Sequence, residues 1–357
     1  MNTKLFKWAF ISLLSLILFF PVISCDSGSS DNGGGSSSGT ITVEISTPGF
    51  LPGEYGYQDY TGTLTVEDGN MTEYELTGRR FIGMADRDIV VIGSNYYAMR
   101  YKITRTVSRE ADGLFAGIAE ATRELQYFYL ETVDEEVPPF DPEGRGYEKG
   151  KGEFQWDANR LLSFTGYGME GEVWIPGSKD VYEYYGNGKL ESIRNADWDG
   201  ESFYFSEAEW YSNYDTTFTD FPSLTWEFYA SYEGDDPSIP ESYNYATNPN
   251  VYDKQYHTQY SYTADSNGRI GTVIQQNYET GIRAEPWVNE LKIEVSYDSS
   301  GNVSTVKLYF DDEGWPEDPT MQMDFSIPSG LGLSFEGLFF PPWNEVLFPF
   351  FEDSGPN

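Results

Sequence analysis

A short turn pattern that recurs along the chain limits its fold more than any other feature. Each copy has an aromatic or apolar residue, then a few Asp, Ser or Asn, then Gly or Asn, then apolar residues at three-residue spacing. Asp, Ser and Asn side chains satisfy turn backbone groups, and Gly accepts a positive φ at low cost. The pattern therefore predicts β-hairpins. The copies are Tyr184–Ile193 (YYGNGKLESI), Tyr262–Val273 (YTADSNGRIGTV), Tyr297–Val306 (YDSSGNVSTV) and, more loosely, Trp156–Phe164 and Val66–Tyr74.

The spacing after each turn makes a second prediction. Apolar residues three apart, such as Leu190 and Ile193, would lie on opposite faces of a regular strand. A β-bulge after the turn restores a common face, so we expect bulged hairpins. Residues 297–302 (YDSSGN) resemble YD-type repeats, which build long β-hairpin wraps in bacterial surface and toxin-shell proteins. The resemblance implies such a wrap here, although a plain hairpin meander fits the same residues.

Composition extends this prediction to the whole chain. Aromatic residues make up 17% of it, with 28 Tyr, 24 Phe and 9 Trp, and such residues suit the pleated surface of a sheet. We predict an all-β protein, an antiparallel aromatic-rich hairpin meander built as an open sheet, a barrel or a YD-like wrap. The strands expected before the first boundary are Ile41–Ser46, a hairpin over Thr61–Leu76 with Asp68-Gly69 at its turn, Arg80–Met84, Ile89–Gly93 and Tyr96–Val107.

One stretch fits a helix as well as a strand. Residues 114–130 carry Leu114, Ile118, Ala121, Leu125 and Phe128 at helical spacing. Residues 126–130 (QYFYL) have the composition of a strand. We therefore expect at most one helix in the chain, near 114–130.

The N-terminus carries an export signal. Lys4 and Lys7 precede an apolar run from Trp8 to Ile23. Ser24 is the small residue before the expected cleavage site, and the chain's one cysteine, Cys25, follows. Residues 22–25 (VISC) resemble the lipobox of bacterial lipoproteins, which implies that residues 1–24 are removed and that Cys25 is acylated, with palmitate among its lipids. An ordinary secretory signal and a transmembrane anchor are the alternatives, but the run is short for a spanning helix and Pro21 interrupts it.

Composition shifts divide the rest of the chain. Residues 25–40 are rich in Ser and Gly and are predicted to form a flexible, lipid-anchored tether. Residues 136–153 are rich in Pro, Gly and charge, so we predict an N-terminal β domain at 41–140 and a hairpin meander at 152–328. Asp235–Pro240 and Tyr245–Asn250 are expected to be loops. In the tail, 329–357, we expect Leu338, Phe339, Phe340 and Trp343 to pack on the surface of the body.

The negative charge of the chain limits the partners that it can bind. The mature chain has 58 acidic residues against 20 basic ones, because Lys4 and Lys7 lie in the signal peptide, and its balance is −38. Such a body repels nucleic acid. With no second cysteine, no intramolecular disulfide can form. The expected location is the cell envelope, at the outer membrane or cell surface in preference to the inner membrane, with a glycan or an envelope protein as partner.

Few residues indicate a catalytic, metal-binding or ligand-binding role. His257 is the one histidine and lies in a strand-like run, which excludes a multi-histidine metal site. Acid clusters on expected turns could bind Ca²⁺; they are Asp197, Asp199, Glu201, Asp311, Asp312 and Glu313. Aromatic side chains beside acids and amides could form a sugar-binding face; the candidates are Trp198, Trp210, Tyr211 and Trp226. No catalytic group is singled out, and no cofactor is expected.

These observations favour a non-enzymatic lipoprotein that binds or supports a partner at the cell envelope. One alternative is a surface carbohydrate-binding module, which requires a row of exposed aromatic side chains. Another is a carbohydrate-active hydrolase, which requires two facing carboxylates roughly 5–10 Å apart.

Overall fold

The structure is a computed structural model. It describes residues 38–50, 57–67, 70–81, 96–109, 115–130, 132, 134–157, 160–215, 217–218, 222–229, 255–279, 288–310 and 314–333. Within these residues the secondary structure is sixteen strands with no helix, which confirms the all-β prediction. The strands are β1 (Gly39–Ser46), β2 (Gln58–Glu67), β3 (Asn70–Phe81), β4 (Tyr96–Arg109), β5 (Phe115–Leu130), β6 (Tyr147–Asp157), β7 (Arg160–Glu170), β8 (Val173–Tyr184), β9 (Leu190–Trp198), β10 (Phe203–Tyr214), β11 (Pro222–Tyr229), β12 (Gln255–Ala264), β13 (Ile270–Glu279), β14 (Val288–Tyr297), β15 (Val303–Phe310) and β16 (Met321–Ser326).

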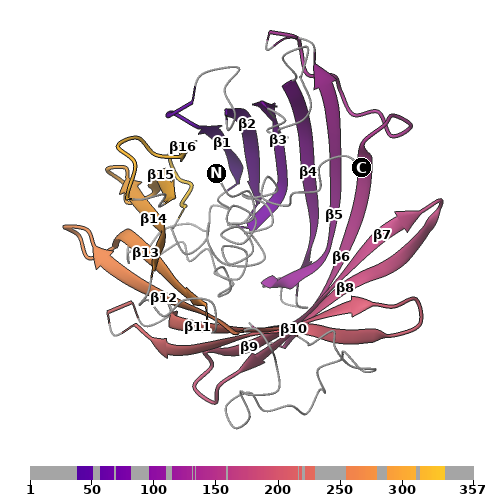
Figure 1. Cartoon of the computed structure of the whole chain (residues 1–357). Helices are drawn as coiled ribbons and strands as arrows, with labels where there is room; N and C mark the ends of the chain where they lie inside the picture. Colours follow the sequence, from indigo (N-terminus) through magenta and orange to yellow (C-terminus); the bar gives the residue numbers. More distant parts are fainter. Residues whose placement is uncertain are drawn as a thin grey trace, which may run out of the picture.

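The strands form one closed barrel. Each strand pairs antiparallel with the next in sequence, and β1 pairs antiparallel with β16, where Thr42 lies opposite Ser326 and Ile45 opposite Met323. Figure 1 shows the resulting ring. Of the three architectures that the sequence left open, the closed barrel is the one formed.

The expected domain boundary does not separate two sheets. β5 pairs with β6 from Glu120–Glu153 to Gln126–Tyr147, so the ring continues past residues 136–153. Residues 136–146 of the Pro- and Gly-rich stretch are instead a connection that folds back on the barrel, and residues 147–153 belong to β6. Residues 41–140 and 152–328 therefore belong to one sheet.

Residues 115–130, where helix and strand were both open, form strand β5. β5 pairs with β4 on one side and β6 on the other, and Tyr101 lies opposite Leu125. A helix would leave the hydrogen-bonding edges of both neighbours unpaired. Long-range pairing thus outweighs the helical spacing of the apolar residues.

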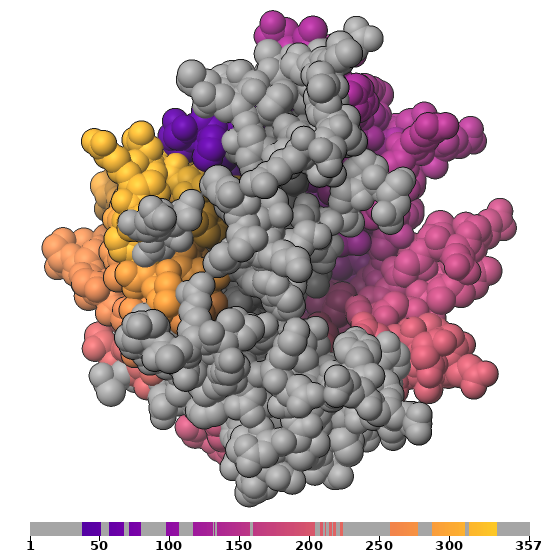
Figure 2. Space-filling model, viewed as in Figure 1, coloured from indigo at the N-terminus to yellow at the C-terminus, as the bar shows by residue number. Residues whose placement is uncertain are grey.

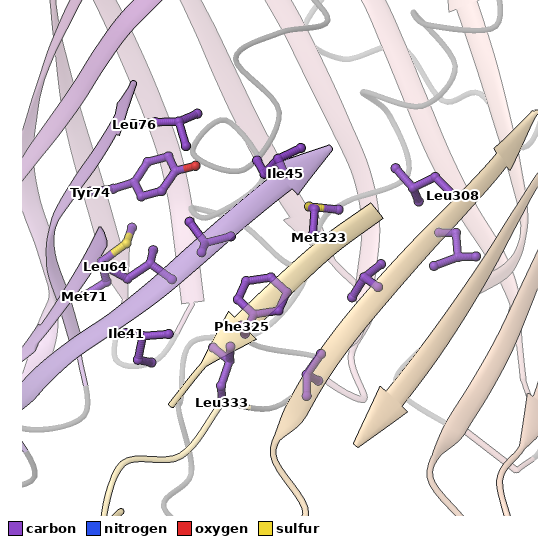
Figure 3. Close-up of a cluster of buried hydrophobic side chains, with 14 of the residues drawn as sticks. Ile41, Ile45, Leu64, Met71, Tyr74, Leu76, Leu308, Met323, Phe325 and Leu333 are labelled. Carbon is purple, nitrogen blue, oxygen red and sulfur yellow. The ribbon is translucent and has the colours of Figure 1, made fainter. Parts of the chain in front are cut away.

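The two faces of the barrel differ in chemistry. In β1, Ile41, Val43 and Ile45 are fully buried, whereas Thr42 and Glu44 between them are exposed. Side chains alternate across a strand, so the apolar residues face the inside of the ring. The same inner face carries Met323 and Phe325 of β16 and Leu308 of β15 (Figure 3).

The two ends also differ. The connections after even-numbered strands up to β14 are short, and none is longer than residues 215–221. At the opposite end the connections include residues 82–95, 131–146 and 230–254. We call these the short-turn end and the long-loop end. β1 begins at Gly39 at the short-turn end, because Gly39 lies opposite Val66 near the end of β2.

The three clearest copies of the sequence pattern form the bulged hairpins that were predicted. In the β12–β13 turn, Asp265 N–H donates to Arg269 O (2.6 Å) and Gly268 N–H donates to Asp265 O (3.1 Å). The β8–β9 and β14–β15 turns repeat this pair of bonds. Gly188, Gly268 and Gly301 have φ of 89°, 80° and 90°. Each strand pair is shifted in register by one residue beside its turn.

Consecutive hairpins are joined by an aromatic side chain at the short-turn end. Tyr297 O–H donates to the carbonyl of Ile270, the first residue of β13, over 2.8 Å. The Arg269 guanidinium lies 3.9 Å from the centre of the Tyr297 ring. We call such contacts the aromatic bridges; in the described residues they are Trp156 to Ile118, Tyr184 to Leu161, Tyr214 to Leu190, Tyr262 to Pro222 and Tyr297 to Ile270.

Some of the other expected elements are confirmed, and the rest lie outside the described residues. The strands at 41–46 and 96–107 are confirmed as β1 and β4, and the hairpin over 61–76 as β2 and β3, with Glu67 opposite Asn70. Residues 80–81 end β3. The rest of the two short strands expected at 80–84 and 89–93, the loops at 235–240 and 245–250, and residues 338–343 of the tail lie outside the described residues.

Candidate functional site

Several predicted site residues lie outside the part of the chain that the structure describes. These are Cys25 with its signal peptide, most of the tether, and the acid cluster Asp311, Asp312 and Glu313. Lipidation at Cys25 stays a prediction. His257 lies in β12 opposite Trp226 and Tyr278, a strand position as expected.

In the acid cluster that the structure describes, Asp199 stabilises a turn. Asp199 Oδ1 accepts hydrogen bonds from the backbone N–H groups of Glu201 and Ser202, each over 2.8 Å. These bonds, with that from Ser202 the strongest, lower the pKa of Asp199. Asp197 lies in β9 opposite Tyr204. Within the described ranges, no three His, Cys, Asp or Glu side chains gather closely enough to hold a metal ion.

The four candidate sugar-binding aromatics lie on three neighbouring strands, β9, β10 and β11. Trp210 of β10 and Trp226 of β11 occupy directly opposed positions on neighbouring strands. Trp198 packs edge-on against Phe203, with ring centres 5.0 Å apart. Tyr211 follows Trp210 in β10. Its side chain is fully buried in the inner cluster.

The inner face carries one buried carboxylate on β10. Glu209 is 5% exposed and accepts a hydrogen bond from the Tyr211 hydroxyl. Burial, and after it the charge of Glu209, raises the pKa of Tyr211 well above its usual value, so the phenol stays protonated. The residue opposite Glu209 on β11 is Glu227.

A ladder of opposite charges covers the outer face over β5–β7. Lys151 Nζ lies 2.7 Å from Glu153 Oε1 and 3.4 Å from Glu120 Oε2. Tyr167 O–H donates to Glu153 Oε2 over 2.9 Å. The hydrogen bond from Lys151, followed by that from Tyr167, lowers the pKa of Glu153. We call Glu120, Lys151, Glu153 and Tyr167 the outer ladder, and such a charged face is suited to water.

One long connection at the long-loop end is fixed against the outside of the barrel. Gln126 Nε2 donates to Asp141 O (3.0 Å) and to Arg145 O (3.3 Å), while Asp141 N–H donates to Gln126 Oε1 (2.7 Å). Val137 packs with Ala98 and Leu130 in a small second cluster. These contacts make residues 134–146 an ordered part of this end.

The β7–β8 hairpin projects from the same end with apolar side chains at its tip. Met169 is 41% exposed and Val173 is 59% exposed. Met169 lies opposite Trp174, and the register ends at Glu170–Val173. Figures 1 and 2 show this hairpin standing out from the ring at one side. We call residues 169–174 the hairpin tip.

Sequence reasoning missed both features of the long-loop end. The tip had a detectable signal, since residues 169–173 (MEGEV) place Gly171 between two acids and two apolar residues, as a tight turn does. The fixed position of residues 134–146 had none, because it depends on Gln126, whose side chain meets them only through the pairing of β5 and β6.

No helix among the described residues is long and apolar enough to cross a membrane.

Comparison with known proteins identifies no family. No family model matches the chain, and no curated protein matches it. Among solved structures, a porin-like protein from Bacteroides uniformis is 11% identical, with a TM-score of 0.26 over 81% of this chain and 97% of that one. The TcdB2-TccC3 structure is 8% identical, with a TM-score of 0.25 over 71% of this chain. This chain spans 20% of the length of that protein.

Proposed function

We propose that this chain is a lipid-anchored, non-enzymatic protein of the cell envelope that presents the long-loop end of its barrel to a partner. The observation that carries the proposal is the position of β1, which begins at Gly39 at the short-turn end. A tether from Cys25 therefore joins the body at that end. The long-loop end then points away from the membrane surface.

The length of the tether supports this orientation. Residues 26–38 separate Cys25 from β1. A Ser- and Gly-rich coil of this length has a root-mean-square span of about 20 Å, and its fully extended length is about 45 Å. The body therefore stays near the bilayer, in water, with its outer ladder solvated. The expected location is the outer membrane or cell surface in preference to the inner membrane.

The long-loop end favours a protein partner. Exposed apolar side chains at Met169 and Val173 are the kind that a protein surface buries on association. A carbohydrate-binding module is less well supported, because the side chain of Tyr211 is fully buried in the inner cluster. A carbohydrate-active hydrolase is also less well supported, because Glu209 is buried and bonded to Tyr211.

Two measurements test the proposal. Cys25→Ser is expected to move the protein from the membrane fraction to the soluble fraction, and retention in the membrane would contradict lipid anchoring. A photo-crosslinking residue at Val173 is expected to give adducts in intact cells, whereas one at Ser266, an exposed residue of a short turn, gives none. Adducts at Ser266 alone would show that the proposed orientation is wrong.

A further inference from the structure

One edge of strand β8 has no neighbouring strand at the hairpin tip. β8 pairs with β7 from Val173, which lies opposite Glu170, but its pairing with β9 begins only at Ser178, which lies opposite Asp197. Among the described strands, none pairs with residues 173–177 on the β9 side. Over these residues, a length of about 15 Å, β8 is an edge strand although the ring is closed. We call residues 173–177 the open edge.

The backbone of the open edge can donate and accept hydrogen bonds. In an antiparallel pair, successive residues direct their N–H and C=O groups alternately to one neighbour and to the other. Pro176 has no N–H, and a strand tolerates proline where its nitrogen faces away from the paired neighbour. Trp174 lies two residues earlier in a regular register with β7, so it shares that direction. The open edge therefore offers the N–H and C=O of Trp174 and the C=O of Pro176.

Apolar side chains lie on both faces of the hairpin beside the open edge. Val173 and Met169 are exposed, and Met169 lies opposite Trp174. Side chains alternate across a strand, so Trp174 and Met169 share one face while Val173 and Ile175 share the other. Figure 1 shows the hairpin projecting from the ring. A strand that pairs with the open edge therefore covers apolar side chains with both of its own faces.

Exposed acidic residues lie at both ends of the open edge. Glu170 and Glu172 belong to the hairpin tip, and Asp199 and Glu201 lie in the turn that begins where β9 leaves β8. The one base of β8 is Lys179, which lies beyond the open edge. Like charges repel and opposite charges steer association. This arrangement therefore opposes a second copy of the chain and favours a basic partner.

We propose that the open edge binds an extended, basic segment of a partner protein by strand addition. The backbone of that segment exchanges two hydrogen bonds with Trp174 and donates one to Pro176 O. Its apolar side chains cover Val173 and Met169, and its Lys or Arg side chains lie beside the acids of the hairpin tip. The inference rests on the proposed function, because it specifies how the long-loop end holds a protein partner.

Two features make the open edge selective. Pro176 removes a backbone donor, and Glu170 and Glu172 repel acidic strands. Short edges that carry proline and charge are a common protection against uncontrolled pairing between strands. We therefore expect reversible binding that favours basic segments, without growth into a larger sheet.

The first test uses synthetic peptides and the mature chain with Cys25→Ser. A fluorescent peptide of alternating Lys and Val is expected to bind, and fluorescence anisotropy measures its affinity. The matched control is the same peptide with every backbone nitrogen methylated, which keeps the charge and removes the donors. We expect the control to bind at least about tenfold more weakly. Equal affinities, or no binding of either peptide, would overturn strand addition.

The second test locates the Lys–Val peptide on β8. Trp174→Pro removes the N–H of the open edge and leaves the pairing with β7 possible. Trp174→Ala removes the same ring but keeps the N–H. We expect Trp174→Pro to bind the peptide about five- to tenfold more weakly than Trp174→Ala, and equal affinities would place the peptide elsewhere. If Trp174→Pro fails to fold, the methylated peptide, which is tested on the unsubstituted edge, decides the matter.

The third test concerns the charge of the partner. Glu170→Gln with Glu172→Gln is expected to weaken binding of the Lys–Val peptide severalfold. The matched control, Glu67→Gln with Asp157→Asn, removes two exposed acids at the short-turn end and should change the affinity by less than about twofold. Equal weakening by the two pairs would show that the acids of the hairpin tip do not select the partner.

Two further outcomes separate this inference from its alternatives. A dimer in analytical ultracentrifugation that Trp174→Pro dissociates would identify a second copy as the occupant and would overturn the inference. Adducts from Val173 in intact cells, together with equal binding of the two peptides, would support a partner at the long-loop end without strand addition. Peptide binding at the open edge without such adducts would instead contradict the proposed function and leave the strand-addition site in place.

Discussion

Two glycines in the β8–β9 turn have different roles. Gly188 has φ of 89°, in the left-handed region, and its N–H donates to Tyr185 O over 2.8 Å. Gly186 has no such φ, and a Cβ there would have no heavy atom within 4 Å. The first position needs glycine for its backbone conformation, whereas the second does not.

Gly188→Ala is therefore expected to lower the free energy of unfolding by about 1–2 kcal/mol. Gly186→Ala, in the same turn, is expected to change it by less than about 0.5 kcal/mol. Urea denaturation followed by Trp fluorescence measures both. Equal losses would show that the turn conformation does not depend on the left-handed residue.

The stability that the outer ladder contributes depends on pH through Glu153. Its pKa is lowered, chiefly by the hydrogen bond from Lys151, so it lies below the value in the unfolded chain. A carboxyl group of this kind stabilises the fold above its unfolded pKa, and that contribution is lost as the pH falls through the folded pKa.

Glu153→Gln is accordingly expected to destabilise the protein slightly at neutral pH and to have no effect at about pH 2, where the carboxyl is protonated in both states. Chemical denaturation at the two pH values measures the difference. Lys151→Met is the control, since it removes the group that lowers the pKa and should reduce the effect of Glu153→Gln. A difference that grows as the pH falls would contradict the assignment.

At the scale of elements, strand spacing depends on glycine at some positions and not at others. A Cβ on Gly78 of β3 would lie 2.2 Å from Asp59 O and 2.5 Å from Tyr60 Cα. These are backbone atoms of β2, so the two strands would have to separate. A Cβ on Gly168 of β7 would have no heavy atom within 4 Å.

We expect Gly78→Ala to cost on the order of 3 kcal/mol or to prevent folding, because relieving the overlap moves paired strands apart. Gly168→Ala, also within a strand, should be neutral or slightly stabilising. Expression yield and thermal unfolding compare the two variants. A stable Gly78→Ala protein would mean that β2 and β3 are further apart than described.

Local chemistry allowed the hairpins to be predicted, while contacts between them could not be. The bulge beside each turn follows from three-residue apolar spacing and from Asp or Asn in the turn, all within about ten residues. The aromatic bridges join residues 23 to 40 positions apart. Nothing in the sequence near Tyr297 indicates that its hydroxyl meets the carbonyl of Ile270.

At the scale of the whole molecule, closure of the ring is the feature that the sequence left open. Buried and exposed residues alternate in β1 and β16, so each is a strand with one buried face. From the sequence, either strand could have been the edge of an open sheet. Their pairing joins the first and last of the described strands, and no local pattern encodes so distant a partner. The same reason explains why a domain boundary was expected where β5 and β6 pair.

A disulfide across this junction tests the closure. Thr42 and Ser326 lie directly opposite each other, and opposed residues of an antiparallel pair have Cα separations of about 4.5–5.5 Å, within disulfide range. With Cys25→Ser, the pair Thr42→Cys and Ser326→Cys is expected to oxidise fully and to raise the stability by on the order of 4–5 kcal/mol.

The control for this pair is Thr42→Cys with Thr305→Cys. Thr305 lies in β15, on the far side of β16 from β1, so that pair should stay reduced. Mobility on a non-reducing gel distinguishes the two variants. Oxidation of the control pair alone would show that β1 and β16 are not neighbours.

The junction between β1 and β16 also sets the order of events as the chain is made. β16 is the last of the described strands to be synthesised, and until Met321–Ser326 emerges, β1 and β15 each present an unpaired edge. Unpaired edges recruit other strands and promote aggregation. Such a chain folds slowly, since its defining contact spans nearly its whole length. We therefore expect folding to compete with aggregation until Met321–Ser326 has paired with β1.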